Sequence, residues 1–511
     1  MGTRLLVYVH TLKWMEATLR WSLLVLVTAG LVSSLGNSSA VKDDFKQCET
    51  AVKKWASSSL EEVKEDKHKL RDLLFFLHIP RTGGRTYFHC FLKKLYSDKL
   101  ECPRSYDKLR FNPRKTNCRL LVTHDDYSVM SKLPKEKTSV VTILRNPVHR
   151  VFSTYEFSIE VAARFLVHPN LTSALHFSGR LRKKTNGVNT LDIWPWKYLV
   201  PWMREDLFAR RDARMQEAPN FIRSNDSYSM VDIIMPLYQY INDPIALDII
   251  HNGATFQVAG LTNNSHVEES HEVRHCVQKY SNLGTYVLEV AKKRVDNMLY
   301  VGLTEDHDRS ATVFAEVIGT QVISQFVGSN ASTDHSANEG SEQDSSLTDS
   351  ELENDPYQSS RDDQNTSNYG SPNTPKSTKK IKLTVGELMK AYKDCITKLR
   401  EAQALRRNRS LMKISPANFT KEARLKVPES VLRQIISLNS LDVELYKYAQ
   451  DIFARQRNCL IQESERQNSI LINSYSGAHS WKNVSMASVL FVLFLVLVLF
   501  LNARRRTKIK I

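Results

Sequence analysis

An unbroken apolar run near the C-terminus constrains this chain more than any other feature. Val489–Leu501 holds no polar side chain, and its flanks extend it toward the ~20 residues that cross a bilayer. A core helix rarely lacks polar residues over such a length. Five basic residues follow the run, which by the positive-inside rule keeps the C-terminus in the cytosol. We therefore expect a transmembrane helix at 485–503, a cytosolic basic tail at 504–511 and a lumenal body.

The N-terminus has the pattern of a signal peptide. Basic residues up to Arg20 precede an apolar run from Trp21 to Leu35, and small residues follow as far as Ala40. We expect residues 1–40 to be removed, which makes the chain a single-pass type I membrane glycoprotein. Asn-X-Ser/Thr sequons agree with a lumenal body. They begin at Asn37, Asn170, Asn225, Asn263, Asn330, Asn365, Asn408, Asn418 and Asn483.

The cysteine count leaves at least one thiol unpaired, because the chain has seven cysteines. Cys90, Cys102 and Cys118 are close enough in sequence to form a local bridge. Cys395 and Cys459 offer a second bridge, between two C-terminal helices. The sequence leaves the pairing open.

Charge divides the chain into an acidic segment and a basic remainder. Ser329–Asn365 carries ten acidic residues and one basic residue among serine, asparagine and aspartate, so we expect a disordered insertion at 328–380. The chain has a net charge of +16, and the part outside this segment reaches +25. The lumenal compartment excludes nucleic acid as a partner. Acidic proteins, polyanionic glycans and phosphorylated small molecules remain as candidates.

Apolar runs that alternate with helical patterns predict an α/β fold, with a parallel sheet flanked by helices. The expected strands are Leu73–Ile79, Arg119–Thr123, Ser139–Leu144, Gln257–Leu261 and Leu299–Leu303. Amphipathic helices are expected at Ile381–Arg407 and Val431–Ile461. One domain thus has a first part at 41–327 and a C-terminal helical part at 381–480, on either side of the acidic insertion.

A glycine turn links the first expected strand to the helix that follows it. Unpaired backbone N–H groups at such a turn bind anions. The segment is Arg81, Thr82, Gly83, Gly84, Arg85 and Thr86. Its glycines admit close approach of the backbone, and its hydroxyls and guanidinium groups add donors and charge. A nucleoside-triphosphate P-loop is excluded, because G-x-x-x-x-G-K-[ST] is absent.

A second anion site is expected after the third strand. Arg145 stands at the end of that strand, and Ser153 lies one to two turns into the next helix. Both side chains can converge on a phosphate. Two anion sites on neighbouring strand–helix units suit a ligand with phosphates at both ends.

Four segments resemble the heparan sulfate 6-O-sulfotransferases. L-H-I-P-R-T-G-G-R-T (77–86) is similar to their 5′-phosphosulfate loop, and I-L-R-N-P-V-H-R-V-F-S-T-Y (143–155) is similar to their 3′-phosphate signature. Residues 300–310 and 438–449 resemble later segments of that family. The resemblance implies a P-loop-like sulfotransferase fold, 3′-phosphoadenosine 5′-phosphosulfate as co-substrate, and no metal.

The layout of the chain resembles the plant tyrosylprotein sulfotransferases, which combine an N-terminal signal with a C-terminal anchor. This resemblance implies a Golgi membrane enzyme that sulfates tyrosines in acidic segments of secreted peptide precursors. The motifs alone leave a heparan-type glycan sulfotransferase open. A third interpretation is a type I receptor that holds an anionic partner on a basic surface without turnover.

The resemblance places the catalytic base at His124, just after the second strand. A phenol with a pKa near ~10 needs such a base, and histidine suits the role. Arg81 stands where the heparan enzymes have lysine, so we expect it to stabilise the leaving phosphate. Asp125 is expected either to orient His124 or to cap a helix. His78 is expected to be a packed core residue.

Overall fold

The computed structural model describes residues 43–61, 68–103, 111–113, 117–180, 194–200, 205–216, 228, 235–329, 384–411 and 419–507. The predicted signal peptide at 1–40, nearly all of the predicted insertion at 328–380 and the end of the basic tail lie outside these ranges. The chain forms two compact units, Met1–Gln450 and Asp451–Ile511.

Four parallel strands form the sheet of the first unit, in the order β2-β1-β3-β4. They are β1 Leu73–Leu77, β2 Leu120–Thr123, β3 Thr138–Leu144 and β4 Tyr300–Leu303. Four of the five predicted strands are thereby confirmed. The register pairs Leu77 with Thr123 and with Thr142, so the chain leaves β1 and β2 at the same edge of the sheet.

The predicted strand at Gln257–Leu261 is wrong. Most of it belongs to helix α10, Gly253–Val258, and to the turn after that helix, where Gly260 has a φ of 65°. Asp442 accepts hydrogen bonds from the N–H groups of Ala254 and Thr255, so the start of α10 is capped from a distant segment. A five-residue segment cannot reveal such a long-range cap, because a short, largely apolar run suits a buried strand and a buried helix equally.

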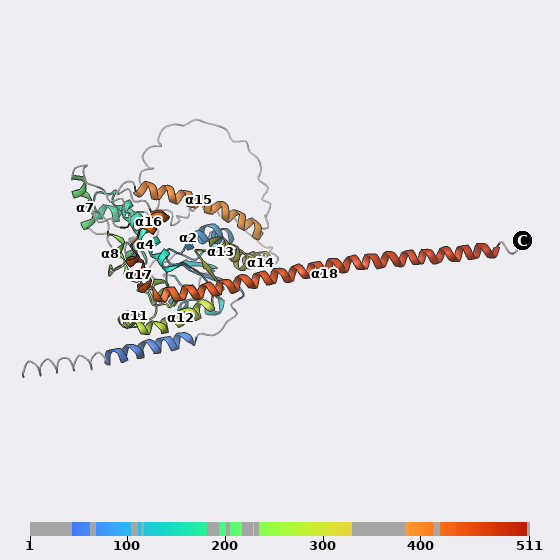
Figure 1. Cartoon of the computed structure of the whole chain (residues 1–511), viewed down its shortest axis with the longest axis horizontal. Coiled ribbons are helices and arrows are strands. Elements are labelled where there is room, and N and C mark those ends of the chain that lie inside the picture. Colours follow the sequence, from blue (N-terminus) through green and yellow to red (C-terminus); the bar gives the residue numbers. More distant parts are fainter. Residues whose placement is uncertain are drawn as a thin grey trace, which may run out of the picture. The chain divides into compact units, whose positions relative to one another are not determined.

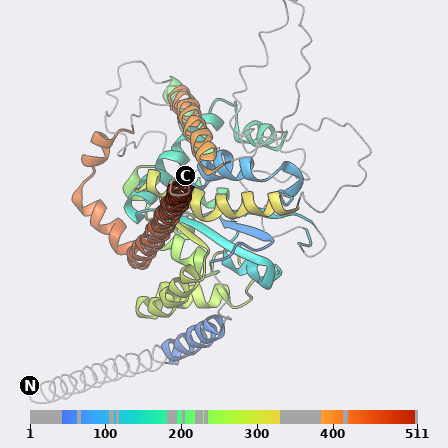
Figure 2. The same ribbon diagram turned by 90° about the vertical axis from the view of Figure 1, so that its right-hand side faces the viewer.

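Helices cover both faces of the sheet (Figures 1 and 2). On one face lie α2 Gly84–Tyr87 with its π-helical continuation Phe88–Leu92, α3 Lys93–Leu95, α13 His307–Phe314, α14 Thr320–Ser329 and α15 Val385–Leu411. On the other face lie α11 Ser270–Lys279 and α12 Gly284–Asp296. The predicted α/β fold with a parallel sheet flanked by helices is confirmed.

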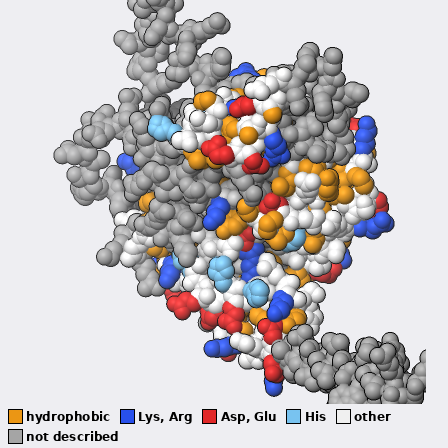
Figure 3. All heavy atoms as spheres, turned by 90° about the vertical axis from the view of Figure 1, so that its left-hand side faces the viewer, with side chains coloured by type: hydrophobic (Ala, Val, Ile, Leu, Met, Phe, Trp, Pro, Cys, Tyr) orange, Lys and Arg blue, Asp and Glu red, His pale blue; other side chains and the backbone are white. Residues whose placement is uncertain are grey.

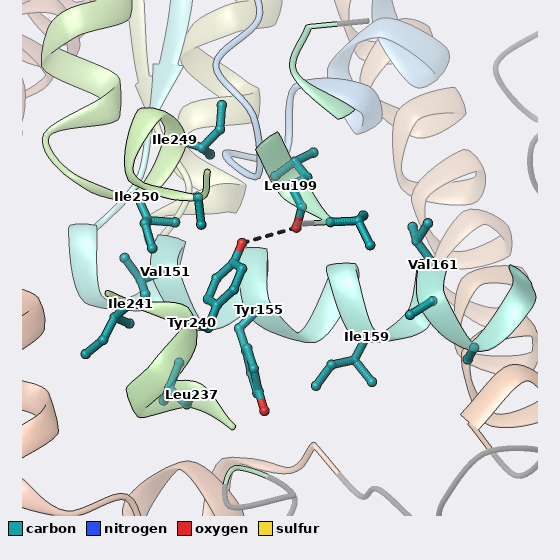
Figure 4. Packing of buried hydrophobic residues seen from close by; sticks show 14 of the residues in the cluster. Val151, Tyr155, Ile159, Val161, Leu199, Leu237, Tyr240, Ile241, Ile249 and Ile250 are labelled. Carbon is teal, nitrogen blue, oxygen red and sulfur yellow. Dashed lines mark hydrogen bonds between the residues drawn. The ribbon is translucent and has the colours of Figure 1, made fainter. Parts of the chain in front are cut away.

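Helix α4, Pro147–Phe165, organises an extensive hydrophobic cluster. Asn146 caps its first turn by accepting from the N–H groups of Val148 and His149, and Pro147 fixes the first helical φ. Its buried face packs on three short helices and on Ile241, and Tyr240 bonds the carbonyl of Leu199 (Figure 4). These helices are α6 Trp196–Leu199, α8 Leu237–Tyr240 and α9 Leu247–Ile250. The packing holds α4 rigidly under the site described below.

The predicted C-terminal helices are confirmed with changed boundaries. The first is α15, and the second is divided at Asn439 into α17 Glu429–Leu438 and α18 Ser440–Thr507. The remaining helices are α5 Leu171–Arg180, α7 Glu205–Gln216, α16 Lys421–Leu425 and a helix over residues 43–60.

The predicted transmembrane helix at 485–503 is not supported. These residues lie in α18, and within the part of the chain that the structure describes no helix combines the length and the apolar character needed to cross a membrane.

Three disulfides lie in the first unit, and two of them join distant parts of the chain. They are Cys48–Cys276, Cys90–Cys395 and Cys102–Cys118. The local bridge between Cys102 and Cys118 confirms one of the predicted options. The predicted bridge between Cys395 and Cys459 is wrong, because α15 packs on the π-helical turn that carries Cys90, and Cys459 is an exposed thiol.

A buried ion pair ties the start of α18 to α4. Arg150 Nη2 lies 2.9 Å from Asp442 Oδ2, with side-chain exposures of 1% and 2%. Asp442 also accepts from the hydroxyl of Thr255, and Arg150 donates to the carbonyl of Ile249. These additional bonds help to offset the desolvation of the pair, although the buried Nε of Arg150 has no acceptor among the described residues.

We predict that Asp442→Asn lowers the free energy of unfolding by about 3–5 kcal/mol, because Arg150 is left as an uncompensated buried charge. Urea unfolding measures the change. Asp206→Asn is the control, since Asp206 pairs with Arg210 on the surface at exposures of 62% and 41%. That variant should lose at most about 1 kcal/mol. Equal losses in both variants would contradict the role assigned to the buried pair.

Candidate active site

The loops that leave the carboxyl ends of β1, β2, β3 and β4 border a cavity of about 590 Å³. Seven arginines and three carboxylates are among the described residues that line it. The arginines are Arg81, Arg85, Arg145, Arg164, Arg400, Arg406 and Arg407, and the carboxylates are Glu101, Asp125 and Glu160. On the face drawn in Figure 3, by contrast, basic and acidic side chains are interspersed. Arginines therefore gather inside the cavity, where an anion would be partly shielded from water.

A larger cavity, of about 700 Å³, lies between the helix at 43–60 and the turn at Tyr127–Ser131. Lysines and carboxylates both line it, and it contains neither the glycine turn nor His124. We therefore place the candidate active site in the smaller cavity.

The glycine turn has the backbone conformation of a tight anion-binding loop. Gly83 has a φ of 85°, and Arg81, which is not a glycine, has a φ of 67°. The Thr82 hydroxyl donates to the carbonyl of Ile79 at 2.9 Å and holds the turn closed. Left-handed backbone at a non-glycine residue is costly and is commonly found at functional sites. The conformation of Arg81 therefore supports a functional role for this turn.

The side chain of Arg81 joins the two predicted anion sites. Its Nε and Nη2 atoms donate to Ser153 Oγ at 3.2 and 3.1 Å, and its guanidinium lies 4.3 Å from the ring centre of Phe157. Burial lowers the pKa of Arg81 to about 10, and the negative charge of Glu160 opposes this shift. Arg81 thus keeps its positive charge at neutral pH.

Arg145 lies on the same side of the turn. Its Nη1 donates to the carbonyl of Arg81 at 3.1 Å. Its buried Nε has no hydrogen-bond acceptor among the described residues, and the nearest carboxylate, that of Glu305, is 3.8 Å away. Burial lowers the pKa of Arg145. A buried guanidinium with an unused N–H favours a bound anion. The structure thus places Arg81 in contact with both Ser153 and Arg145, and the binding of a phosphate by Arg145 and Ser153 stays a prediction.

The segment 300–310 fixes the loops of the site to one another. The Thr304 hydroxyl lies 2.6 Å from the carbonyl of Thr82 and 3.1 Å from that of Leu144. Glu305 accepts from the N–H of Asn146 at 3.1 Å and from the hydroxyl of Tyr446 at 2.8 Å. These bonds hold the turns after β1 and β3 against β4.

His124 is held in one orientation and one tautomer. Its Nδ1 lies 2.8 Å from the carbonyl of His78, and since a carbonyl only accepts, Nδ1 carries the proton. The lone pair of the neutral ring is then on Nε2. Trp194 Nε1 and Gln257 Nε2 each donate to the carbonyl of His124 at 2.8 Å and fix its backbone. This arrangement suits a general base.

The expectation that His78 is a packed core residue is wrong. Its ring is half-buried, lines the cavity and stacks on the ring of His124, with 4.2 Å between centroids and 28° between planes. Burial lowers the pKa of His78 well below its usual value, and the neighbouring His124 adds to this shift. A side chain at Gly84 would overlap the His78 ring, so glycine is required there.

Asp125 does not provide the helix cap that was one of its two expected roles. Its carboxylate accepts from the hydroxyl of Thr123 at 3.0 Å and from the amide of Asn264. The next residue, Asp126, caps the turn by accepting from the N–H of Ser128. Burial raises the pKa of Asp126. Both carboxylates therefore shape the loop that presents His124.

A curated relative decides the family. The chain is 56% identical over 486 residues to the protein-tyrosine sulfotransferase of Arabidopsis thaliana. The alignment covers 92% of this chain and 95% of that protein. No family model matches the chain. The chain belongs to the protein-tyrosine sulfotransferase family. The predicted resemblance to the plant tyrosylprotein sulfotransferases is confirmed.

Sequence reasoning missed several residues of this protein-tyrosine sulfotransferase site. Arg400, Arg406 and Arg407 reach the cavity from α15, beyond the predicted insertion, and Trp194 and Trp196 line it from another wall. The basic run at 405–409 and the Trp-Pro-Trp segment at 194–196 were the available signals. Neither segment shows from its sequence alone which part of the fold it contacts.

Proposed function

We propose that this chain transfers a sulfuryl group from 3′-phosphoadenosine 5′-phosphosulfate to tyrosine hydroxyls in acidic segments of secreted peptides and proteins. The observation that carries the proposal is the cavity in which half-buried arginines meet a histidine held as the Nδ1–H tautomer. Membership in the protein-tyrosine sulfotransferase family supports the choice of acceptor.

The donor would occupy the two joined anion sites. In this proposal the turn Arg81–Thr86 binds the 5′-phosphosulfate, and Arg145 and Ser153 bind the 3′-phosphate. The buried Nε of Arg145 offers an N–H that such an anion would accept, so the residues present fit the donor. Charge-assisted hydrogen bonds of this kind are stronger than neutral ones. No metal is invoked, and the described residues hold no cluster of three or more metal-binding side chains.

The reaction needs alignment, charge neutralisation and one proton acceptor. The phenol oxygen forms a bond to sulfur while the bond between sulfur and the 5′-phosphate oxygen breaks. His124 Nε2 takes the phenol proton. Arg81 neutralises the charge that returns to the leaving phosphate, and the electrons of the broken bond remain on that phosphate.

The acceptor would be an acidic peptide segment. Arg400 and Arg407 line the wall contributed by α15, where they can attract carboxylates beside the tyrosine. Arg407 Nη2 also bonds the buried Glu156 at 2.8 Å, which fixes its side chain in the wall. Opposite charges on a peptide and on its binding groove speed the encounter of the two molecules and fix the position of the peptide along the groove.

We also propose that the enzyme works in the Golgi lumen as a glycoprotein. Three disulfides support an oxidising compartment, since such bridges are rare in the cytosol. Co-localisation of a fluorescent fusion with a Golgi marker, and a mobility shift after glycosidase treatment, test this. A uniformly cytosolic signal would contradict it.

The acceptor prediction compares three substrates with labelled donor: an acidic tyrosine peptide, a neutral peptide with the same tyrosine, and desulfated heparan. The acidic peptide should be sulfated most efficiently. Its advantage over the neutral peptide should shrink with added salt, because charges are screened over about 8 Å at physiological ionic strength. Equal use of both peptides would remove the acidic requirement, and label on heparan alone would identify a glycan enzyme.

The donor prediction concerns Arg145→Ala and Ser153→Ala. Each should weaken the binding of 3′-phosphoadenosine 5′-phosphate by about 1.5–3 kcal/mol, because a charge-assisted hydrogen bond is lost. Isothermal titration calorimetry measures the affinity. Arg210→Ala, on the surface of α7, is the matched control and should bind as the wild type does. Unchanged affinity in both site variants would exclude these residues from the donor site.

The base prediction concerns His124→Ala. Turnover should fall by the ~10²–10⁴-fold typical of a lost general base, with little change in donor affinity. His271→Ala, at an exposed position of α11, should leave turnover unchanged. If His124→Ala turned over at the wild-type rate, another group would be the base. If it also lost donor binding, His124 would have a structural role instead.

A further inference from the structure

We infer that Trp196 and Phe157 form an aromatic binding site for the phenol ring of the acceptor tyrosine. The inference rests on the proposed function and deepens it, since it names the part of the cavity that recognises the acceptor side chain.

The two rings form one continuous aromatic wall. Their centroids are 5.3 Å apart and their planes meet at 48°. Trp196 begins the short helix α6, and Phe157 lies on α4, so two separately packed elements supply the wall. Both side chains are half-buried and both line the cavity. Aromatic surface therefore remains accessible to a ligand inside a cavity that seven arginines also line.

The aromatic wall is connected to Arg81 and to His124, the two groups to which the proposed function assigns the leaving phosphate and the phenol proton. At one end, the Arg81 guanidinium lies 4.3 Å from the ring centre of Phe157 and donates to Ser153. At the other end, Trp194, two residues before Trp196, donates its indole N–H to the carbonyl of His124 at 2.8 Å. An acceptor ring on this wall would lie in the same cavity as the leaving-group cation and the base.

The chemistry of the wall suits a phenol. Aromatic rings associate edge-to-face or in offset stacks, and this attraction adds about 0.5–1.5 kcal/mol to that of simple burial. The acceptor of a protein-tyrosine sulfotransferase is an aromatic ring with one hydroxyl. The arginines of the cavity offer charge to the flanking residues of a peptide, but they offer nothing that distinguishes tyrosine from serine or threonine. The aromatic wall supplies that distinction.

The test compares Trp196→Leu with Trp196→Phe. Leucine keeps apolar bulk without a ring, whereas phenylalanine keeps a ring. The measurements are KM for an acidic tyrosine peptide, the inhibition constant of the same peptide with phenylalanine replacing tyrosine, and calorimetric affinity for 3′-phosphoadenosine 5′-phosphate. Tyr238→Ala is the control, because Tyr238 is an exposed aromatic residue that does not line the cavity.

In Trp196→Leu, KM and the inhibition constant should rise together by about 3- to 10-fold. Donor affinity should stay unchanged, and Trp196→Phe should recover most of the loss. Equal behaviour of the leucine and phenylalanine variants, or a parallel loss of donor affinity, would overturn the inference. If the wild type failed to sulfate any tyrosine peptide, the proposed function would fail. Calorimetric binding of the phenylalanine peptide would then still decide whether the wall recognises an aromatic ring.

Discussion

The buried ion pair between Arg150 and Asp442 is the interaction on which the site geometry depends. It joins residues almost three hundred positions apart, and Asp442 also caps α10, the helix that supplies Gln257 to the backbone of His124. Arg150 lies one turn before Ser153 on α4, so the pair fixes the helix that meets the glycine turn. One carboxylate thereby sets the positions of both the donor side and the base side of the cavity.

Burial in this cavity disfavours the positive charges of its arginines. Burial lowers the pKa values of both Arg81 and Arg145, and each of these guanidinium groups disfavours the charge of its neighbours. Glu160 and Glu305 are the largest effects that oppose the lowering of these pKa values, and they offset the effect of burial only in part. An anion with two phosphates would complete the compensation, so the cavity is preorganised for a highly charged ligand.

Local patterns in the sequence were sufficient for the sheet and for the groups at its edge. A buried run followed by proline and two glycines specifies a strand and a turn, and parallel strands carry the residues after them to one edge. Arg81 and Arg145 could therefore be predicted to lie at one edge, whereas His124 was assigned from the resemblance to the heparan sulfate 6-O-sulfotransferases. Long-range packing decided the rest. His78 follows a buried strand, yet its ring turns toward His124 because Gly84 leaves room for it. Gln257 lies in a helix only because Asp442 caps it, and Cys395 pairs with Cys90 only because α15 packs on the helix after the glycine turn.

The bridge between Cys90 and Cys395 also determines what a break in the polypeptide would do. It spans residues 330–383, so cleavage of any peptide bond there yields two fragments that stay covalently joined until the disulfide is reduced. The second fragment carries Arg400 and Arg407, and the first carries the glycine turn and His124. Proteolytic nicking in an oxidising compartment would therefore leave every wall of the cavity on one covalent body. Reduction after nicking would leave the α15 wall held to the rest only by packing and by non-covalent bonds such as the buried pair of Arg150 and Asp442.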